Sequence, residues 1–119
     1  MPFAVEITQT GKPDVLRETD KATPTPDAGE ILIRNKAGAV NFIDTIIRRG
    51  EMPEGMMPDL PHTPGVEGAG LVEVLGKGVE GFSVGDRVAW MGPIGAGGYG
   101  THSVIAAPYV TRLAETVDF

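Results

Sequence analysis

Cysteine is absent from the 119 residues of this sequence. Disulfide bonds and thiolate metal ligands are therefore excluded, and a chain built without disulfides is typical of a reducing compartment. We accordingly expect a cytoplasmic protein. Aromatic residues are also few, with four phenylalanines, two tyrosines and one tryptophan against 17 glycines and 10 prolines. This balance favours turns and short strands over long helices.

Positive charge is scarce as well, because 10 lysines and arginines face 16 aspartates and glutamates, for a net charge of −6. Such an acidic chain is unsuited to nucleic acid or to an anionic membrane surface, so we expect neither partner. No apolar run approaches the roughly 20 residues that a membrane-spanning helix needs. No charged segment followed by an apolar one opens the chain, so a signal segment is not expected.

The short apolar segments that remain predict strands. The length suits one domain, residues 1–119, that can bury a sizeable core. Strands are expected at 3–9, 15–19, 30–37, 71–75, 86–91, 102–107 and 109–113. Many short strands joined by glycine and proline turns, with one helix, indicate a mainly β fold, a partly open β-barrel with one short helix.

The glycine-rich stretch 64–88 organises the rest of the chain. It reads PGVEGAGLVEVLGKGVEGFSVGDRV and holds seven of the seventeen glycines. The small residues at 65 and 68–70 let a strand bend sharply or let another backbone approach closely. The apolar run 71–75 favours a strand, and Gly85-Asp86 is a turn pair between extended segments.

The single helix is expected over 42–50. Asn41 is a good N-cap, Asp44 in the first turn suits the helix dipole, and Gly50 can close the last turn. An apolar stripe of the helix is expected to face the core, formed by Phe42, Ile43, Ile46 and Ile47.

Two loops invite functional hypotheses. The proline-rich segment 51–64 is long enough for a binding or lid role, and its Met52, Met56 and Met57 form either an apolar pocket rim or loop packing. The segment 95–100, GAGGYG, fits the letters of a dinucleotide-binding fingerprint. That fingerprint requires a helix directly afterwards, whereas a strand pattern follows here, so a glycine-rich turn between strands is the preferred interpretation.

The motifs PGVEGAG and VEVLGKGVEGFSVGDRV, together with VNFIDTIIRRG at 40–50, resemble one known family. The chain is similar over its whole length to the N-terminal, GroES-like catalytic domain of the medium-chain dehydrogenase/reductase superfamily. The segment 40–50 resembles its zinc-free quinone oxidoreductase branch. The resemblance implies a separate Rossmann domain beyond residue 119 that binds NADPH, and a homo-oligomer when full length.

The resemblance also implies that zinc is absent. Zinc-dependent members hold a cysteine before the helix and a histidine before the glutamate, where this chain has Asn41 and Val66. Neither is a plausible zinc ligand. His62 and His102 stand forty residues apart without a carboxylate pattern between them, so a two-histidine metal site is not expected either.

Candidate site residues follow from the same positions. Asn41 is either a helix cap alone or also a cleft residue that touches substrate and nicotinamide; Asp44 is a family signature residue near that cleft. Glu67 is either a catalytic acid/base on the cleft floor or a structural carboxylate hydrogen-bonded to backbone or arginine. Trp90 either covers the core or lines the substrate pocket.

Ile46 departs from the family, since zinc-dependent relatives commonly hold a proton-relay histidine here and many quinone reductases a tyrosine. Isoleucine neither relays a proton nor donates a hydrogen bond. Any proton must then come from water or from the other domain, and Ile46 is expected to form an apolar substrate wall.

The resemblance therefore implies an NADPH-dependent, zinc-independent oxidoreductase that passes a hydride to a small-molecule quinone or enone. The chain of 119 residues alone is expected to be inactive, because the cofactor fingerprint is missing from it. Two alternatives stay open. One is a free-standing GroES-like barrel that binds or assembles without catalysis, and the other is a catalytically silent relative kept for structure.

Overall fold

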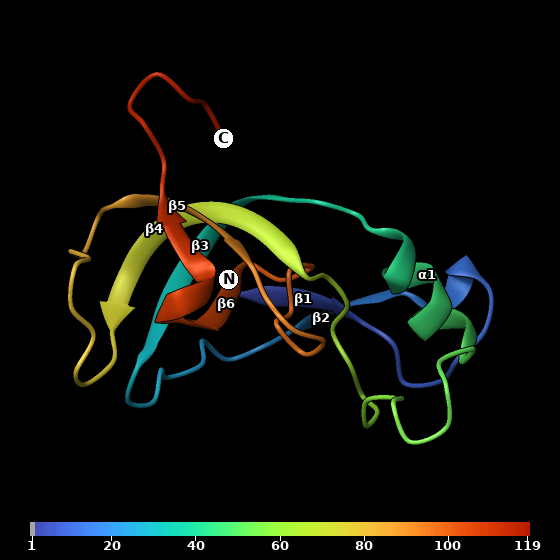
Figure 1. Ribbon diagram of the computed structural model, residues 1–119. Coiled ribbons are helices and arrows are strands. Elements are labelled where there is room, and N and C mark those ends of the chain that lie inside the picture. The colour runs from blue at the N-terminus through green and yellow to red at the C-terminus, as the bar shows by residue number, and fades with distance from the viewer. Residues whose placement is uncertain (1) are drawn as a thin grey trace.

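Two antiparallel sheets and one α-helix make up the fold in a computed structural model, which describes residues 2–119 (Figure 1). The first sheet pairs β1 (Phe3–Glu6) with β2 (Arg17–Asp20). The second has the strand order β6-β3-β4-β5-β7. Its strands are β3 (Glu30–Gly38), β4 (Glu67–Leu75), β5 (Arg87–Met91), β6 (His102–Ala106) and β7 (Val110–Arg112). The helix α1 spans Phe42–Arg49, and two 3₁₀ turns are η1 (Pro13–Val15) and η2 (Ala107–Tyr109).

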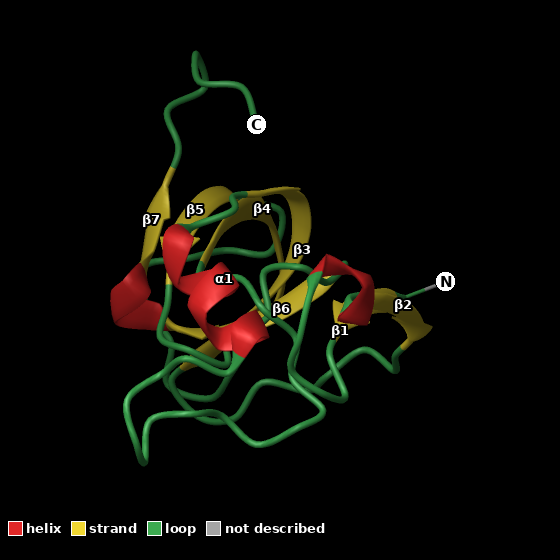
Figure 2. Ribbon diagram, turned by 90° about the vertical axis from the view of Figure 1, so that its right-hand side faces the viewer, coloured by secondary structure: helices red, strands yellow, loops and turns green. Residues whose placement is uncertain are grey.

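The expected mainly β fold with one substantial helix is confirmed. Both sheets are open, and within residues 2–119 the strands form no closed barrel. Figure 2, seen from the α1 end, shows the curved larger sheet behind the helix. Four expected strands differ in their ends. The strand expected at 3–9 stops at Glu6, and the strand expected at 71–75 already begins at Glu67. The other two are displaced by 3₁₀ turns. The turn η1 occupies residues 13–15, so β2 starts at Arg17, and η2 shortens the last strand to Val110–Arg112.

Pairing between β3 and β4 is the longest in the molecule. It runs from Ile31 opposite Leu75 to Gly38 opposite Gly68, with register shifts after Leu32 and after Asn35. Bulges of this kind bend and twist a strand, which accounts for the strong curvature of the sheet. The expectation that small residues near position 70 permit close backbone approach is confirmed. A Cβ on Gly70 would lie 2.1 Å from the carbonyl oxygen of Arg34.

The hydrophobic core is built on the larger sheet and is mainly aliphatic. Its buried members come from all five strands and from the loop after β5, and they are Ile31, Ile33, Val72, Val88, Trp90, Ala96, Ile105 and Val110. Alternate residues of β5 and β6 are buried, as expected for strands with one face on a core.

The helix α1 begins after Asn41, whose extended backbone is that of an N-cap, and Gly50 closes it in the left-handed conformation. The predicted ends are therefore confirmed. The predicted apolar stripe is wrong at one position, because Phe42 is 74% exposed while Ile47 and the polar Asp44 are buried. A hydrogen-bonded carboxylate thus occupies part of the face that sequence periodicity assigned to hydrophobic residues.

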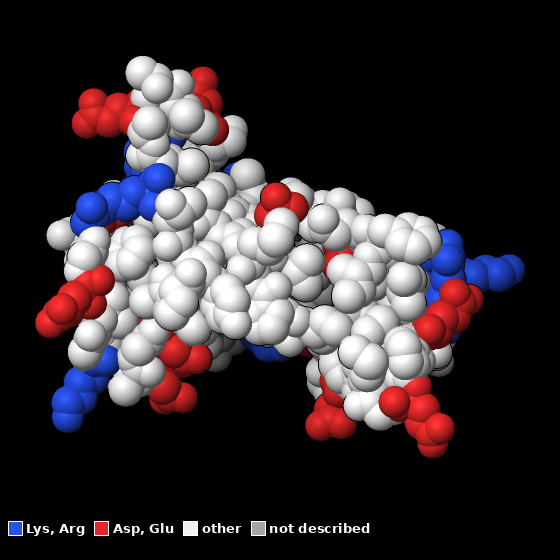
Figure 3. Space-filling view, viewed as in Figure 1, with Lys and Arg blue, Asp and Glu red and all other residues white. Residues whose placement is uncertain are grey.

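Charged side chains lie mostly around the edges of the face shown in Figure 3, and its centre is largely uncharged. Within residues 2–119 there is no helix with the length and apolar character needed to cross a membrane.

The close contact at Gly70 leads to a stability prediction. Gly70→Ala should destabilise the chain by more than the roughly 1–3 kcal/mol of ordinary overpacking, because its methyl group meets backbone and not a flexible side chain. Gly100→Ala is the matched control, since a Cβ there has ordinary contacts of 3.4 Å or more. Urea denaturation of both variants makes the comparison. Equal midpoints would show that β3 and β4 separate easily at this point.

Candidate functional site

Two polar side chains meet where β3 ends and β4 begins. Because these strands are antiparallel, Gly38 lies opposite Gly68, so the residues just after β3 return to the start of β4. The Ala39 N–H donates to the Glu67 carbonyl at 3.1 Å, which holds the two segments together. The Asn41 side-chain amide then donates to Glu67 Oε2 at 3.1 Å. Glu67 is hydrogen-bonded to a side chain, and not to the backbone or arginine partner considered from sequence.

A buried carboxylate stands beside this pair. Asp44 is 3% exposed, and its Oδ2 accepts hydrogen bonds from the Asn41 backbone N–H and from the Tyr99 hydroxyl, both at 2.9 Å. The first bond is part of a capping box at the start of α1. Asp44, which was expected to suit the helix dipole there, thus also contributes a hydrogen bond. Asp44 Oδ1 is buried and has no hydrogen-bond partner within residues 2–119. The side chain of Asp44 is buried in the protein, and its two hydrogen bonds orient Asn41 and Tyr99.

Tyr99 is the member of this cluster that sequence reasoning missed. It belongs to the glycine-rich segment 95–100, which leads directly into β6, so the expected turn between strands is confirmed. The only feature of the sequence that could have pointed to Tyr99 was its phenol side chain within a run of glycines. Its partner Asp44 is 55 residues away, and that separation cannot be inferred from local pattern.

Asn35 holds the loop that carries Tyr99. Its side-chain amide donates to the Gly100 carbonyl at 3.0 Å and to the Ser103 hydroxyl at 2.8 Å. The Asn35 carbonyl oxygen accepts from the Trp90 indole N–H at 3.1 Å, and Ser103 donates onward to the Gly97 carbonyl at 3.0 Å. Each of these polar groups is satisfied, and a satisfied network of this kind favours one conformation of a loop.

An apolar cavity of about 440 Å³ opens next to Glu67. Trp90 lines it, together with small residues of β3, β4 and β5. Trp90 is also 3% exposed and part of the core, so it has both of the roles considered from sequence. The cavity has the size and the mainly apolar lining of a small-molecule site. Its charged lining residue among those described is Glu67.

Two titratable groups near the cluster have displaced pKa values. Burial, with the hydrogen bond to Asp44 as the second cause, raises the pKa of Tyr99 well above its usual value. The phenol therefore stays protonated and serves as a donor to Asp44. Burial lowers the pKa of His62; the negative charge of Asp44 opposes this effect and the positive charge of Lys21 reinforces it.

Among the predicted site residues, Glu67 and Trp90 line the apolar cavity, and Asn41 and Asp44 do not line it themselves. Asn41 is connected to it through its hydrogen bond to Glu67. Ile46 is half-buried and follows Asp44 by two residues, which places it about 200° around the helix from Asp44. Neither Ile46 nor the three methionines of the 51–64 loop line the apolar cavity. Their assignment to a substrate wall or pocket rim stays a prediction.

The chemistry available here is that of hydrogen bonding and proton exchange. Asn41 offers an amide, Glu67 a half-buried carboxylate, and Trp90 an apolar surface. Within residues 2–119, no three histidine, cysteine, aspartate or glutamate side chains are grouped so that they could hold a metal ion.

Comparison with known proteins identifies the relatives of this chain. Residues 27–115 match the family described as "Alcohol dehydrogenase GroES-like domain". A quinone oxidoreductase of Pseudomonas aeruginosa is 40% identical over 120 residues, which cover 100% of this chain and 35% of that protein. A quinone oxidoreductase of Lama guanicoe is 38% identical over 117 residues, which cover 98% of this chain and 34% of that protein.

Solved structures have the same fold. The crystal structure of Escherichia coli quinone oxidoreductase complexed with NADPH superposes with a TM-score of 0.90 at 35% identity, covering 98% of this chain and 35% of that one. The chain thus spans about a third of the length of the curated relatives it matches.

Tyr99→Phe tests the buried cluster. Removal of the hydroxyl deprives the Asp44 carboxylate of one donor, and a buried acceptor that loses a partner costs about 1–3 kcal/mol. Tyr109→Phe is the control, because Tyr109 is 52% exposed. Urea denaturation should show a lower midpoint for Tyr99→Phe alone; similar midpoints would mean that Asp44 finds another donor.

The pKa of His62 predicts how stability depends on pH. Because this pKa is lower in the folded than in the unfolded chain, the unfolded chain binds more protons between the two values. The free energy of unfolding should therefore decline as pH falls below about 6.5, the ordinary histidine value, and keep declining down to the folded pKa. His62→Gln should show a weaker decline between pH 7.5 and 5.5. Carboxylates titrate in both the wild-type protein and His62→Gln, so their contribution to the decline cancels in the comparison. Parallel declines of the two proteins would contradict the prediction.

Proposed function

Because the chain belongs to the alcohol dehydrogenase GroES-like domain family, as the N-terminal catalytic domain of the medium-chain dehydrogenase/reductase superfamily, we propose a function within that family. The function is NADPH-dependent, zinc-independent reduction of a quinone or enone. The carrying observation is the hydrogen bond from the Asn41 amide to Glu67, which lines the apolar cavity together with Trp90. The relatives named quinone oxidoreductases support the class of substrate.

The pyrophosphate and the nicotinamide ends of NADPH would be bound by different domains. The glycine-rich segment 95–100 leads into a strand, so it lacks the helix N-terminus that holds a dinucleotide pyrophosphate. A separate domain would therefore bind most of NADPH, as the resemblance implies. The Asn41 amide and the apolar cavity fit the nicotinamide end and the substrate, because they combine one polar group with an uncharged surface. When bound, NADPH supplies the hydride.

The residues of this chain would then position the acceptor. One N–H of the Asn41 amide is engaged by Glu67, and the second is available to donate to a substrate oxygen. Asp44 acts as a positioning residue, since it is buried and bonds the Asn41 backbone. The lining around Trp90 keeps water from the reacting atoms, which strengthens that hydrogen bond. Without a Lewis acid, the rate would depend on this positioning.

Reduction of a quinone to a hydroquinone takes up a proton besides the hydride. Ile46 has no ionisable group, and the Tyr99 hydroxyl is engaged by Asp44. Two ionisable residues line the cavity, Glu67 and Tyr109, and of these Glu67 is the one hydrogen-bonded to Asn41. Its side chain is half-buried and so remains in reach of water. We therefore assign proton delivery to water and Glu67. The cytoplasmic location and the homo-oligomeric assembly stay predictions.

Asn41→Ala tests this function in a protein that carries both this chain and its NADPH-binding domain. Loss of one preorganised donor should lower kcat by about 10²-fold. The Kd for NADPH should change much less, because the proposal places most cofactor contacts elsewhere. Steady-state kinetics with a quinone and fluorescence titration of NADPH measure the two quantities.

Asn41→Ser separates catalysis from capping. Serine remains a good N-cap, so the helix should stay stable, but its short side chain reaches neither Glu67 nor the substrate. We expect Asn41→Ser to lose turnover as Asn41→Ala does while it unfolds at nearly the wild-type midpoint. If a stably folded Asn41→Ala retains its kcat, Asn41 is a cap and nothing more.

A further inference from the structure

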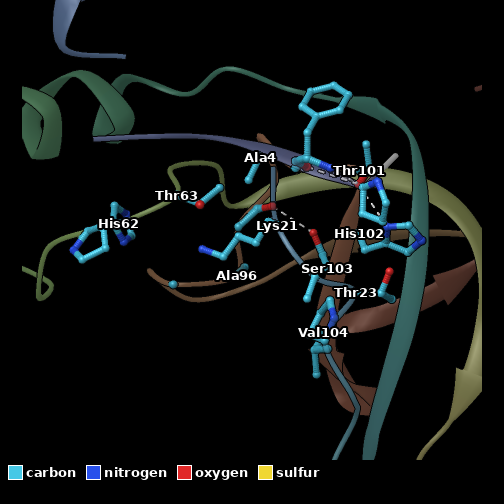
Figure 4. A pocket seen from close by; sticks show the side chains of 18 residues that line it. Ala4, Lys21, Thr23, His62, Thr63, Ala96, Thr101, His102, Ser103 and Val104 are labelled. Atoms are coloured by element: carbon cyan, nitrogen blue, oxygen red, sulfur yellow. Dashed lines mark hydrogen bonds between the residues drawn. The ribbon is translucent and has the colours of Figure 1, made fainter. Parts of the chain in front are cut away.

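A second cavity, of about 330 Å³, lies apart from the proposed catalytic cleft. It opens between β1 with the connector after β2 on one side, and β6 with the glycine-rich loop on the other (Figure 4). Lys21 and Thr23 come from the connector, His62 from the loop before β4, and His102 and Ser103 from β6. None of its described lining residues also lines the apolar cavity, so the two are distinct sites.

The charge of this cavity differs from that of the protein. The chain has a net charge of −6, yet among residues 2–119 no aspartate or glutamate lines the cavity. Lys21, two histidines and several hydroxyl groups do. A concave site that combines a cation, hydrogen-bond donors and an absence of lining carboxylates favours an anionic ligand. Its volume is at the small end of ligand sites.

Lys21 keeps most of its capacity to bind. Its ammonium is 3.3 Å from Glu6 Oε2, but the side chain is 52% exposed, and exposed pairs of this kind contribute little. An ammonium has three N–H donors, of which Glu6 takes one. His102 is less available, because its Nε2 lies 3.0 Å from Glu73 Oε2 and its Nδ1 is 3.0 Å from the Thr101 hydroxyl.

His62 is the second group that can meet a ligand. It is buried and lines the cavity, and its ring forms no hydrogen bond with another side chain or with the backbone within residues 2–119. The ring nitrogens are not among the fully buried atoms that lack a partner, so they stay accessible to a small molecule. Burial is the main cause of the lowered pKa of His62; the charge of Asp44 opposes it, and the charge of Lys21 adds a smaller lowering effect. Thus Lys21 and His62 together supply a cation and a free donor.

We propose that this cavity binds the oxyanion of a small organic molecule, a carboxylate or a phosphate group, between Lys21 and His62. The ammonium neutralises the charge and the imidazole N–H donates a hydrogen bond to one oxygen. The surrounding threonine and serine hydroxyls bind further polar groups. This inference does not depend on the proposed reductase function, because it uses none of the residues of the catalytic cleft.

NMR of the histidine rings tests the proposal on the chain itself. Succinate, inorganic phosphate and uncharged succinamide are added separately at constant ionic strength, and the ring resonances of His62 are followed from pH 5 to 8. A bound anion should shift them saturably and raise the pKa of His62, because it offsets the charge of Lys21. The effective anion distinguishes a carboxylate from a phosphate ligand. No saturable change with either anion, or an equal one with succinamide, would overturn the proposal.

Two variants that each remove one lysine charge supply the control. Lys21→Gln should weaken anion binding by about tenfold, as expected for a lost charge-assisted hydrogen bond, and should raise the pKa of His62 in the free protein. Lys12→Gln removes an exposed charge outside the cavity and should leave binding unchanged. Because Lys21 is half-exposed, both variants should fold. Equal affinities in the two would show that Lys21 is not the binding cation.

Discussion

The antiparallel pairing of β3 with β4 is the constraint on which the rest of the molecule depends. Its closest point, Gly70 against the Arg34 carbonyl, leaves no room for a side chain, and its bulges curve the sheet around the core. The same pairing places Glu67, at the start of β4, beside the segment that follows β3 and contains Asn41. The meeting of an amide and a carboxylate at the cavity is therefore a direct consequence of strand register.

A second layer of polar contacts makes this arrangement specific. Asn35 connects Trp90 to the glycine-rich loop, and that loop presents Tyr99 to the buried Asp44 at the start of α1. The helix, the loop and the core tryptophan are thus held in one arrangement by groups that would be costly to bury without partners.

The two cavities differ in the chemistry of their lining residues. One is mainly apolar, with one carboxylate in its lining, and suits a flat, uncharged substrate. The other is polar, without lining carboxylates among the described residues, and suits an anion. His62 connects the second cavity to the buried cluster electrostatically, because Asp44 and Lys21 act on its pKa in opposite directions. The chain therefore presents two surfaces with different ligand preferences on one sheet framework.

Local pattern in the sequence was sufficient for the strands, for the ends of α1 and for the small residues at the bend, because periodicity, capping and backbone freedom act over a few residues. Composition and motif order were sufficient for the family. Only the tertiary structure decided that Phe42 faces solvent and Asp44 the interior, that Tyr99 and Asn35 belong to the site, and that Lys21 and His62 border one cavity. Those outcomes depend on contacts between residues 40 to 65 positions apart, which hydrogen bonding and burial select and sequence spacing does not encode.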